Sequence, residues 1–532
     1  KKIINAITNE ITLTNNIELL DVDAGKDTNR TVVTFLGSPD LVIEAAFNGI
    51  KKASELIDMR NHTGEHPRMG ATDVCPLIPV SNVSMNECIK YSKILAQKVS
   101  KELNIPIFLY EESANISIRK NLANIRKGEY EGMQEKLKDP KWKPDYGENQ
   151  INLKSGVTAI GARNYLIAYN INLNSKDKKI ASDIALDIRE LGRARRDLKG
   201  KIIRNSSGNI KRKPGKLKST KAVGWYIDEY KKAQVSMNLT NYRITSIHSA
   251  FEEVRKQARK RGLRVTGSEI VGLIPKEALI DAGLFYLEKQ NKSRAVPEKD
   301  IIHIAIESLG LNDISTFDPI LSIVENRISS SNYLANLKVS AFVNEVSNDS
   351  PAPGGGSVSA LSGSLSASLI AMVSNLTFGK KEYENKKRII EKIGCDAQKI
   401  KKELNLLIDS DTDAFNMIME SFRLPKKTID EKAIRNAKIQ KATINAIEIP
   451  FKVMSLSMKS LKLSVKIAKI GNKNSLSDSG VASEMAFSAI NGAYMNVLIN
   501  LKELTNHNYI NNMNKKSNTL IKEANKIIKE CR

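Results

Sequence analysis

Hydrophobic and polar residues follow two rhythms over the first hundred residues. Four short apolar runs have the length and spacing of β-strands, and three longer segments place apolar residues every three or four positions, as an amphipathic helix does. The strand-like runs cover residues 17–22, 31–36, 72–80 and 105–110. The helix-like segments cover residues 1–11, 38–57 and 84–103, and Ser84 with Glu87 predicts a capping box at the start of the third. The alternation predicts an α/β architecture.

A similar order of elements returns between residues 164 and 273. The expected elements are strand 164–172, helix 179–191, strands 222–227 and 234–239, helix 246–261 and strand 263–273. This is the split βαβ order, βαββαβ, of ferredoxin-like subdomains. The first half matches it if one strand precedes Lys1, so we expect a first subdomain, 1–163, without its opening strand and a second at 164–328. The basic segment 197–220 is predicted to be a mobile loop.

The pattern changes near residue 329. Residues 329–334 are polar and are expected to link two domains, and residues 335–532 have helical periodicity. The segment 358–378 is rich in Ala, Ser and Gly, which let helices approach closely, so it is predicted to lie inside a bundle. The predicted fold class is therefore α/β (α+β) plus all-α: two ferredoxin-like subdomains followed by a helical-bundle domain.

Charge and cysteine content narrow the classes of function. The 532 residues include 83 Lys or Arg and 59 Asp or Glu, a net charge of +24, but the basic residues are spread along the chain and aromatic residues make up only 5%. This favours a solvated surface, or attraction of a polyanionic small molecule, over nucleic-acid binding. The four cysteines are widely spaced, which disfavours disulfides and a zinc site, and no apolar run is long enough for a membrane span. We expect a cytoplasmic protein without a metal, nucleic-acid or membrane partner.

The densest cluster of candidate chemistry lies at residues 64–76. His66 stands between an acid and a proline, with glycines on both sides, and histidine can take and return a proton near neutral pH. A histidine that merely completes a turn is the alternative. Cys75 lies in an apolar strand and is expected to be a core residue.

Three further patterns are weaker. Asp23 ends a strand, although aspartate near glycine is also common in turns. A glycine run opens a helix, where free backbone N–H groups could hold an anion or a carbonyl oxygen. Asp409, Asp411 and Asp413 share one helix, so one of them is expected to face the bundle with a raised pKa, and a solvated acidic patch is the alternative. The glycine run comprises Gly354, Gly355, Gly356 and Ser357.

These segments together resemble one family. The resemblance is carried by the block 64–80 with Asp145-Tyr146-Gly147 and Gly224-Trp225-Tyr226, and in the helical part by 352–358 and 409–415. The chain resembles the formimidoyltransferase-cyclodeaminase family along its whole length.

The resemblance implies two reactions. The formimino group of N-formimino-L-glutamate passes to N5 of tetrahydrofolate, and ring closure to 5,10-methenyltetrahydrofolate then releases ammonia. By this resemblance His66 exchanges the proton, Asp23 orients it, Arg68 pairs with a substrate carboxylate, and Asp411 serves ring closure. The resemblance also implies a polyglutamylated folate co-substrate without a metal, and a ring-like homo-oligomer. The stretch that would bind folate comprises Gly147, Glu148, Asn149, Gln150, Ile151, Asn152, Leu153, Lys154, Ser155 and Gly156, with Ser155 where the family often has an aromatic residue.

Two alternatives remain open from the sequence. One half alone could be active, as a transferase or as a methenyltetrahydrofolate-processing domain. The second alternative is a basic nucleic-acid-binding or scaffold protein that keeps only the fold of the family.

Overall fold

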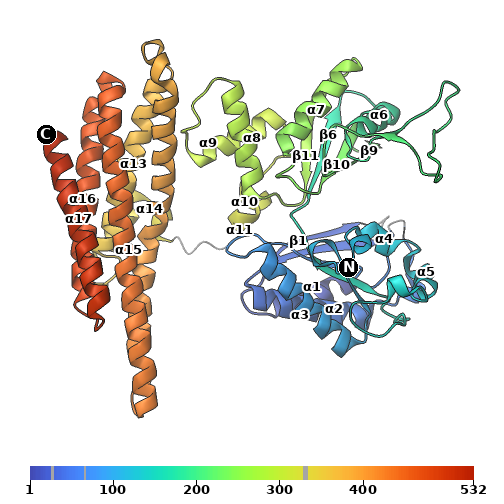
Figure 1. Ribbon diagram of the computed structural model, residues 1–532, viewed down its shortest axis with the longest axis horizontal. Coiled ribbons are helices and arrows are strands. Elements are labelled where there is room, and N and C mark those ends of the chain that lie inside the picture. The colour runs from blue at the N-terminus through green and yellow to red at the C-terminus, as the bar shows by residue number, and fades with distance from the viewer. Residues whose placement is uncertain (26–28, 65–66, 328–332, 532) are drawn as a thin grey trace. The chain divides into compact units, whose positions relative to one another are not determined.

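The structure is a computed structural model that describes residues 1–25, 29–64, 67–327 and 333–531. Its chain forms two compact units (Figure 1). The first consists of Lys1–Ala282 with Ile306–Ser329, and the second of Gly283–Ala305 with Ser330–Arg532. The first is mixed α/β and the second is helical, as the hydrophobic pattern predicts.

The first α/β subdomain contains two separate sheets among its described residues. Strands β1 and β2 form an antiparallel hairpin, and β3, β5 and β4 form a parallel sheet in that order. The sequence reading missed the central strand β5, whose five residues are all buried and include Gly and Ala, so no polar alternation marks it. The elements are α1 (Lys2–Thr12), β1 (Glu18–Gly25), β2 (Arg30–Leu36), α2 (Pro39–Leu56), β3 (Val74–Leu77), α3 (Met85–Leu103), β4 (Ile107–Leu109) and β5 (Thr158–Ala162).

Short helices fill the segment between β4 and β5, which the sequence reading treated as irregular. They include α4 (Leu122–Arg126) and α5 (Glu129–Lys136). The buried ion pair of Arg119 with Asp145 (Nη1–Oδ2 2.7 Å) holds this segment on β4, because Asp145 also accepts the backbone N–H of Leu109 at 2.8 Å. The remaining 3₁₀ turns of this subdomain are η1 (Met59–Asn61), η2 (Glu111–Ser113), η3 (Ser117–Arg119) and η4 (Pro140–Trp142).

The second α/β subdomain has the predicted split βαβ topology. Its sheet has the order β11-β6-β10-β9 with antiparallel neighbours, so the first and third strands of the motif are central. Helices α6 and α7 pack against the sheet. The elements are β6 (Ile167–Leu173), α6 (Lys178–Ile188), β9 (Thr220–Ile227), β10 (Lys232–Leu239), α7 (Ile247–Lys260) and β11 (Val265–Val271).

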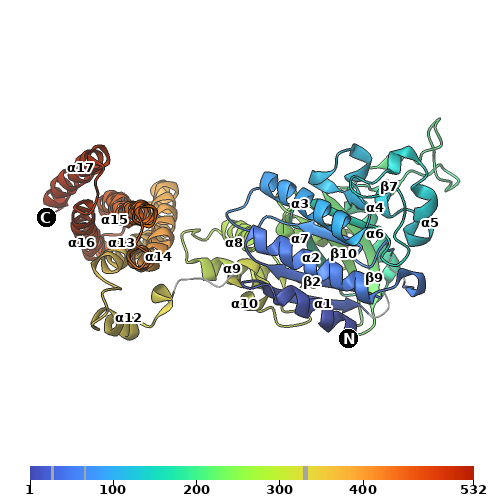
Figure 2. The ribbon, with the colours of Figure 1, turned by 90° about the horizontal axis from the view of Figure 1, so that it is seen from below.

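The predicted mobile loop at 197–220 is instead a paired ribbon, which Figure 2 shows beside the label β7. Its base is the strand pair β7 (Arg193–Ala194) and β8 (Arg212–Lys213). Two matching turns follow eight residues apart: the Asp197 and Asn205 side chains each accept two backbone N–H groups, and Gly200 and Gly208 take φ values of 79° and 76°. The sequence reading missed this order because single Asp/Asn–Gly turns look the same in loops and hairpins.

Four more helices follow β11, in a segment that the sequence reading did not assign. They are α8 (Lys276–Lys289), α9 (Glu298–Leu309), α10 (Pro319–Ser322) and α11 (Val324–Arg327). The α8–α9 connection belongs to the second unit, where Ser293 donates to Asn375 at 2.7 Å and Arg294 pairs with Glu391 at 3.0 Å.

The helical unit is a bundle of long helices, seen nearly end-on in Figure 2. Buried serines bridge neighbouring helices, as where Ser366 and Ser460 hydroxyls lie 2.7 Å apart. By length and composition α13 could cross a membrane, but most of its apolar window is buried in the bundle. The elements are η5 (Leu334–Asn336), α12 (Val339–Val346), α13 (Gly355–Phe378), η6 (Lys381–Lys386), α14 (Lys387–Phe422), α15 (Ile429–Ile470), η7 (Lys473–Ser475), α16 (Leu476–Leu501) and α17 (His507–Cys531).

Candidate active sites

The loop that carries His66 is fixed on both sides, although Glu65 and His66 themselves lie outside the described residues. On one side, the Asn29 side chain at the start of β2 donates to the carbonyl oxygen of Thr63 at 2.6 Å. Asp23 lies on β1 opposite Val32 and is exposed. The hairpin that carries Asp23 is therefore bonded to the loop that carries His66.

Arg68 fixes the other side of this loop. Its guanidinium donates to Glu129 at 2.8 Å, to Glu131 at 2.5 and 2.9 Å, and to the carbonyl oxygen of His62 at 3.0 Å. The hydrogen bond to Glu131, ahead of the effect of Glu129, raises the pKa of Arg68. In this structure the terminal guanidinium nitrogens bind protein acceptors and anchor the loop to α5, and the pairing of Arg68 with a substrate carboxylate stays a prediction.

The predicted folate stretch, 147–156, lies directly against this loop. Ala71 donates its backbone N–H to Ser155 at 2.8 Å, and Val157 donates to Met69 at 2.9 Å. Gly70 and Gly156 form the crossing point, with φ of 72° at Gly156. Two segments that the sequence marked separately therefore form one surface.

The folate stretch exposes mainly polar side chains. Ile151, Ser155 and Gly156 are buried, and the other residues are exposed except the half-buried Asn152. The Asn152 side chain accepts the backbone N–H groups of Lys154 and Ser155, which fixes the bend. Ser155 is 3% exposed, so the position where the family often has an aromatic residue faces inward here. Leu153 is the exposed apolar side chain of this stretch, at 56%.

Cys75 is half-buried and packs against the hydrophobic core of the first subdomain. It pairs with Ile160 in the β3–β5 ladder, and burial raises the pKa of its thiol to about 12. A thiol with such a pKa stays protonated and unreactive at neutral pH.

A second cluster of candidate residues lies where α13 begins. Asp411, in the middle of α14, faces Gly356: a β-carbon at Gly356 would overlap its carboxylate. The Ser357 hydroxyl lies 3.5 Å from Asp411 Oδ2 and donates to the carbonyl oxygen of Ile408 at 2.7 Å. Burial raises the pKa of Asp411, and the backbone N–H and hydroxyl of Ser357 oppose this by stabilising the anion.

The three carboxylates on α14 have three different environments. Asp409 is 4% exposed and accepts the backbone N–H groups of Leu334 at 2.7 Å and Ala335 at 3.0 Å, so it caps the segment that enters the bundle. Asp413 is exposed and borders a cavity of about 420 Å³ between α14 and α15. The sequence expected one of the three to face the bundle, and the structure places two of them there, only Asp411 beside the glycine run.

The sequence reading missed one polar residue of this site. A β-carbon at Gly355 would lie 3.4 Å from Asn496 Nδ2, so α16 brings an amide to the glycine run. Nothing in the local sequence around Asn496 marks it, since it donates to Gly492 as an ordinary helical side chain does. Within the described ranges, no cluster of three or more His, Cys, Asp or Glu side chains could hold a metal ion.

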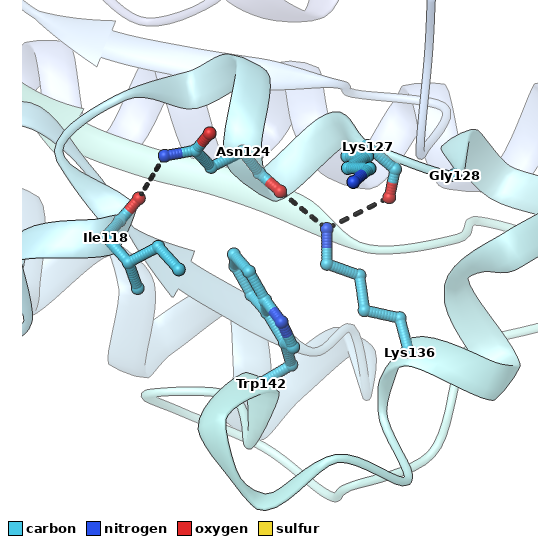
Figure 3. Close-up of a pocket in the computed structure, with 6 residues that line it drawn as sticks. All are labelled: Ile118, Asn124, Lys127, Gly128, Lys136 and Trp142. Carbon is cyan, nitrogen blue, oxygen red and sulfur yellow. Dashed lines mark hydrogen bonds between the residues drawn. The ribbon is translucent and has the colours of Figure 1, made fainter. Parts of the chain in front are cut away.

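A further cavity borders neither candidate site directly. It measures about 520 Å³ and is lined by residues of α4, α5 and the turn at Trp142 (Figure 3). The lining residues are Ile118, Asn124, Lys127, Gly128, Lys136 and Trp142.

The fold and these two clusters define an enzyme with an α/β transferase unit and a helical ring-closing unit. Three family models match in the same order: the formiminotransferase domain, N-terminal subdomain, at residues 1–163, the formiminotransferase domain at 168–329, and formiminotransferase-cyclodeaminase at 338–519.

Relatives match both units at once. The chain is 42% identical to the formimidoyltransferase-cyclodeaminase of Dictyostelium discoideum and 40% identical to that of Rattus norvegicus, each over 98% of this chain and 94% of the relative. It is also 44% identical to the glutamate formimidoyltransferase of Streptococcus pyogenes, over 52% of this chain and 85% of that protein. The chain belongs to the formimidoyltransferase-cyclodeaminase family.

Proposed function

We propose that this chain carries out two consecutive reactions on folate at two separate sites. The first moves the formimino group from N-formimino-L-glutamate to N5 of tetrahydrofolate, and the second closes the ring to 5,10-methenyltetrahydrofolate. The observation that carries the proposal is the placement of Asp411 against the glycine run in the helical unit, while the loop of His66 meets the folate stretch in the α/β unit.

In the transfer step, N5 attacks the formimino carbon and a tetrahedral adduct forms. The bond from that carbon to the glutamate nitrogen then breaks. His66 takes the proton from N5 and returns it to the departing nitrogen, so glutamate leaves neutral at that atom. Asp23, on the hairpin bonded to the same loop, favours the imidazolium that exists between these two transfers.

In the ring-closing step, N10 attacks the carbon of the protonated formimino group (an amidinium), and the NH2 group of the resulting adduct leaves as ammonia once it has received one more proton. Asp411 receives the N10 proton and delivers it to the leaving nitrogen. The raised pKa of Asp411 suits this role, because burial makes the protonated carboxyl group easier to form, so the group can donate a proton as well as accept one. The Ser357 backbone N–H and the free N–H groups at the start of α13 stabilise the aspartate while it is charged.

We further propose that the folate carries a polyglutamate tail. A net charge of +24 raises the local concentration of a polyanion by electrostatic attraction, which requires no specific contact. The test is the KM for tetrahydrofolate with one and with five glutamates at 50 and 300 mM salt. The proposal expects a lower KM for the longer tail that rises steeply with salt, and equal KM values would contradict it.

We also propose a ring-like homo-oligomer in the cytoplasm. Exposed apolar side chains on α13, including Val358, Leu365 and Leu376, favour self-association of the helical unit. Four widely spaced, unpaired cysteines suit a reducing compartment. Sedimentation velocity of the full chain tests the assembly, and a monomer at micromolar concentration would contradict it.

Separate assays of glutamate and ammonia release test the two reactions. The wild type should release both from formiminoglutamate and tetrahydrofolate. His66→Ala should lose glutamate release yet still release ammonia from supplied 5-formiminotetrahydrofolate, and Asp411→Ala should do the reverse. Release of neither product by the wild type would leave the scaffold or nucleic-acid alternative, and loss of both steps in both variants would refute the separation of sites.

A further inference from the structure

Lys136, near the C-terminal end of α5, bonds back to the corner between α4 and α5 (Figure 3). Its ammonium donates to the carbonyl oxygens of Asn124 at 2.6 Å, Ile125 at 2.6 Å and Lys127 at 3.0 Å. The Trp142 ring lies 4.0 Å from the same nitrogen. An ammonium has three N–H donors, and all three of Lys136 bind backbone carbonyl oxygens. The face of the Trp142 ring also lies against the ammonium.

The corner that Lys136 binds has an unfavourable backbone. Helix α4 has five residues, so its last carbonyls have no partners within the helix. The chain then passes through two successive left-handed residues, Gly128 at φ 95° and Glu129 at φ 56°. A left-handed glutamate costs about 1–2 kcal/mol, so this corner needs contacts from outside the turn to persist.

The residues just after this corner bind both halves of the candidate transferase site. Glu129 and Glu131 bind the guanidinium of Arg68, and Tyr130 donates its backbone N–H to the Arg68 carbonyl oxygen at 2.9 Å. The Tyr130 hydroxyl donates to the carbonyl oxygen of Leu153 at 2.6 Å. One turn of α5 therefore holds the His66 loop with one set of groups and the folate stretch with another.

We propose that Lys136 is a positioning residue for formimino transfer: it holds the α4–α5 corner so that the first turn of α5 keeps the His66 loop and the folate stretch in register. It contacts neither of those segments itself. The inference rests on the proposed assignment of the transfer step to the His66 loop. A displacement of about 1 Å of a reacting group costs on the order of 100-fold in rate. A small movement of the corner would therefore lower the rate of transfer.

The central test replaces Lys136 with Met, which keeps most of the volume and removes the charge and the donors. The transfer kcat should fall 10- to 100-fold with a smaller change in the KM for folate. Ammonia release from supplied 5-formiminotetrahydrofolate should not change, because Asp411 lies in the other compact unit. Lys136→Arg keeps a cation with several donors and should stay within about threefold of wild type.

Lys138→Met is the matched control. Lys138 lies two residues further on, is 69% exposed and pairs with Glu135 at 2.7 Å, so its loss removes the same charge without touching the corner. Its transfer kcat should match that of the wild type. An equal loss in the Lys138 variant would show a general charge effect and overturn the proposal.

A double-variant cycle with Glu131→Gln separates positioning from mere stability. If Lys136 acts through the turn that binds Arg68, the double variant should be no slower than the slower single variant. The proposal would be overturned if the losses in transfer kcat of the two single variants multiplied in the double variant. It would also be overturned if transfer and ammonia release fell in parallel in Lys136→Met. Should Lys136→Met fail to fold, Lys136→Gln, which removes the charge and shortens the side chain but keeps a polar group, decides instead by a selective fall in transfer kcat or its absence.

The outcome is distinguishable from a failure of the proposed function. If His66→Ala keeps full transfer activity, the site assignment is wrong whatever Lys136 does. If His66→Ala abolishes transfer and Lys136→Met leaves it unchanged, only the positioning role is wrong.

Discussion

Gly156 crosses Gly70 so closely that neither position has room for a side chain. A β-carbon on Gly156 would overlap the carbonyl oxygen of Met69, and one on Gly70 would overlap the carbonyl oxygen of Val157. This crossing joins the folate stretch to the loop that carries His66, so its integrity decides whether the α/β unit has a complete transferase site.

Gly156→Ala should therefore impair transfer selectively. The methyl group of alanine would overlap the backbone of Met69 and of Gly70. A φ of 72° is also in the left-handed region, which is unfavourable for alanine, so the crossing must open. We expect a loss of about 2–4 kcal/mol in stability, typical of strain at a special backbone position, and at least a tenfold fall in transfer kcat. Thermal unfolding and glutamate release measure the two effects.

Gly200→Ala is the control for backbone strain alone. Gly200 has a similar φ of 79°, but its β-carbon would meet nothing within 4 Å. It should lose only about 1 kcal/mol and keep both activities. An equal transfer defect in both variants would contradict a specific role for the crossing.

Gly356→Ala should abolish ring closure and spare transfer. Its β-carbon would occupy the space of the Asp411 carboxylate, so the acid must leave the start of α13. Ammonia release from 5-formiminotetrahydrofolate should fall at least 100-fold, with glutamate release unchanged. Gly480→Ala, on α16 with open space around it, should leave both reactions unchanged and stabilise slightly, because alanine favours a helix more than glycine does.

Asp411→Asn should stop ring closure while stabilising the folded chain at neutral pH. Burial raises the folded pKa of Asp411 above its ordinary value of 3.8, so the folded chain binds more protons than the unfolded chain between these two values. Stability therefore falls as pH rises through that window and stays lower above it. The asparagine variant lacks this penalty, so its gain in Tm should be present at pH 7 and disappear below about pH 4, as calorimetry would measure.

Asp409→Ala should destabilise the helical unit without acting on the chemistry directly. It leaves the N–H groups of Leu334 and Ala335 without an acceptor, at about 1–3 kcal/mol for each buried group. Asp413→Ala, exposed on the same helix, should change the free energy of unfolding by less than about 0.5 kcal/mol. Denaturant unfolding of both variants measures the difference, and equal values would contradict the capping role.

Cys75→Ser should retain transferase activity. The thiol pKa of about 12 leaves almost no thiolate at neutral pH, so the sulfur takes no part in the transfer. Alkylation of the native chain should label Cys531, which is exposed, much faster than Cys75, which is half-buried. Rapid labelling of Cys75 in the native chain together with loss of glutamate release would contradict this.

Local patterns determined much of the fold. The capping box of Ser84 and Glu87 forms as predicted at the start of α3, because each partner lies three residues from the other. The second α/β subdomain has the predicted order because its strands and helices carry clear periods of two and three to four residues. Element bounds differ from prediction by a few residues.

The sequence failed where the deciding contact is distant along the chain or lacks a pattern. Strand β5 is small-residue and buried on both faces, so it reads as neither strand nor helix. The ion pairs of Arg68 were not predicted, because its partners Glu129 and Glu131 lie about sixty residues away along the chain.

By itself the sequence determined the family, the two-unit organisation and the residue types that each reaction needs, since motifs and periodicity are local properties. Only the tertiary structure decided which of the α14 carboxylates lies at the glycine run, and that the folate stretch crosses the His66 loop at Gly156. The physical reason is that helix periodicity brings both Asp409 and Asp411 into the bundle but does not say what each will meet. That depends on where α13 and the segment at Leu334 pack, which no local pattern encodes.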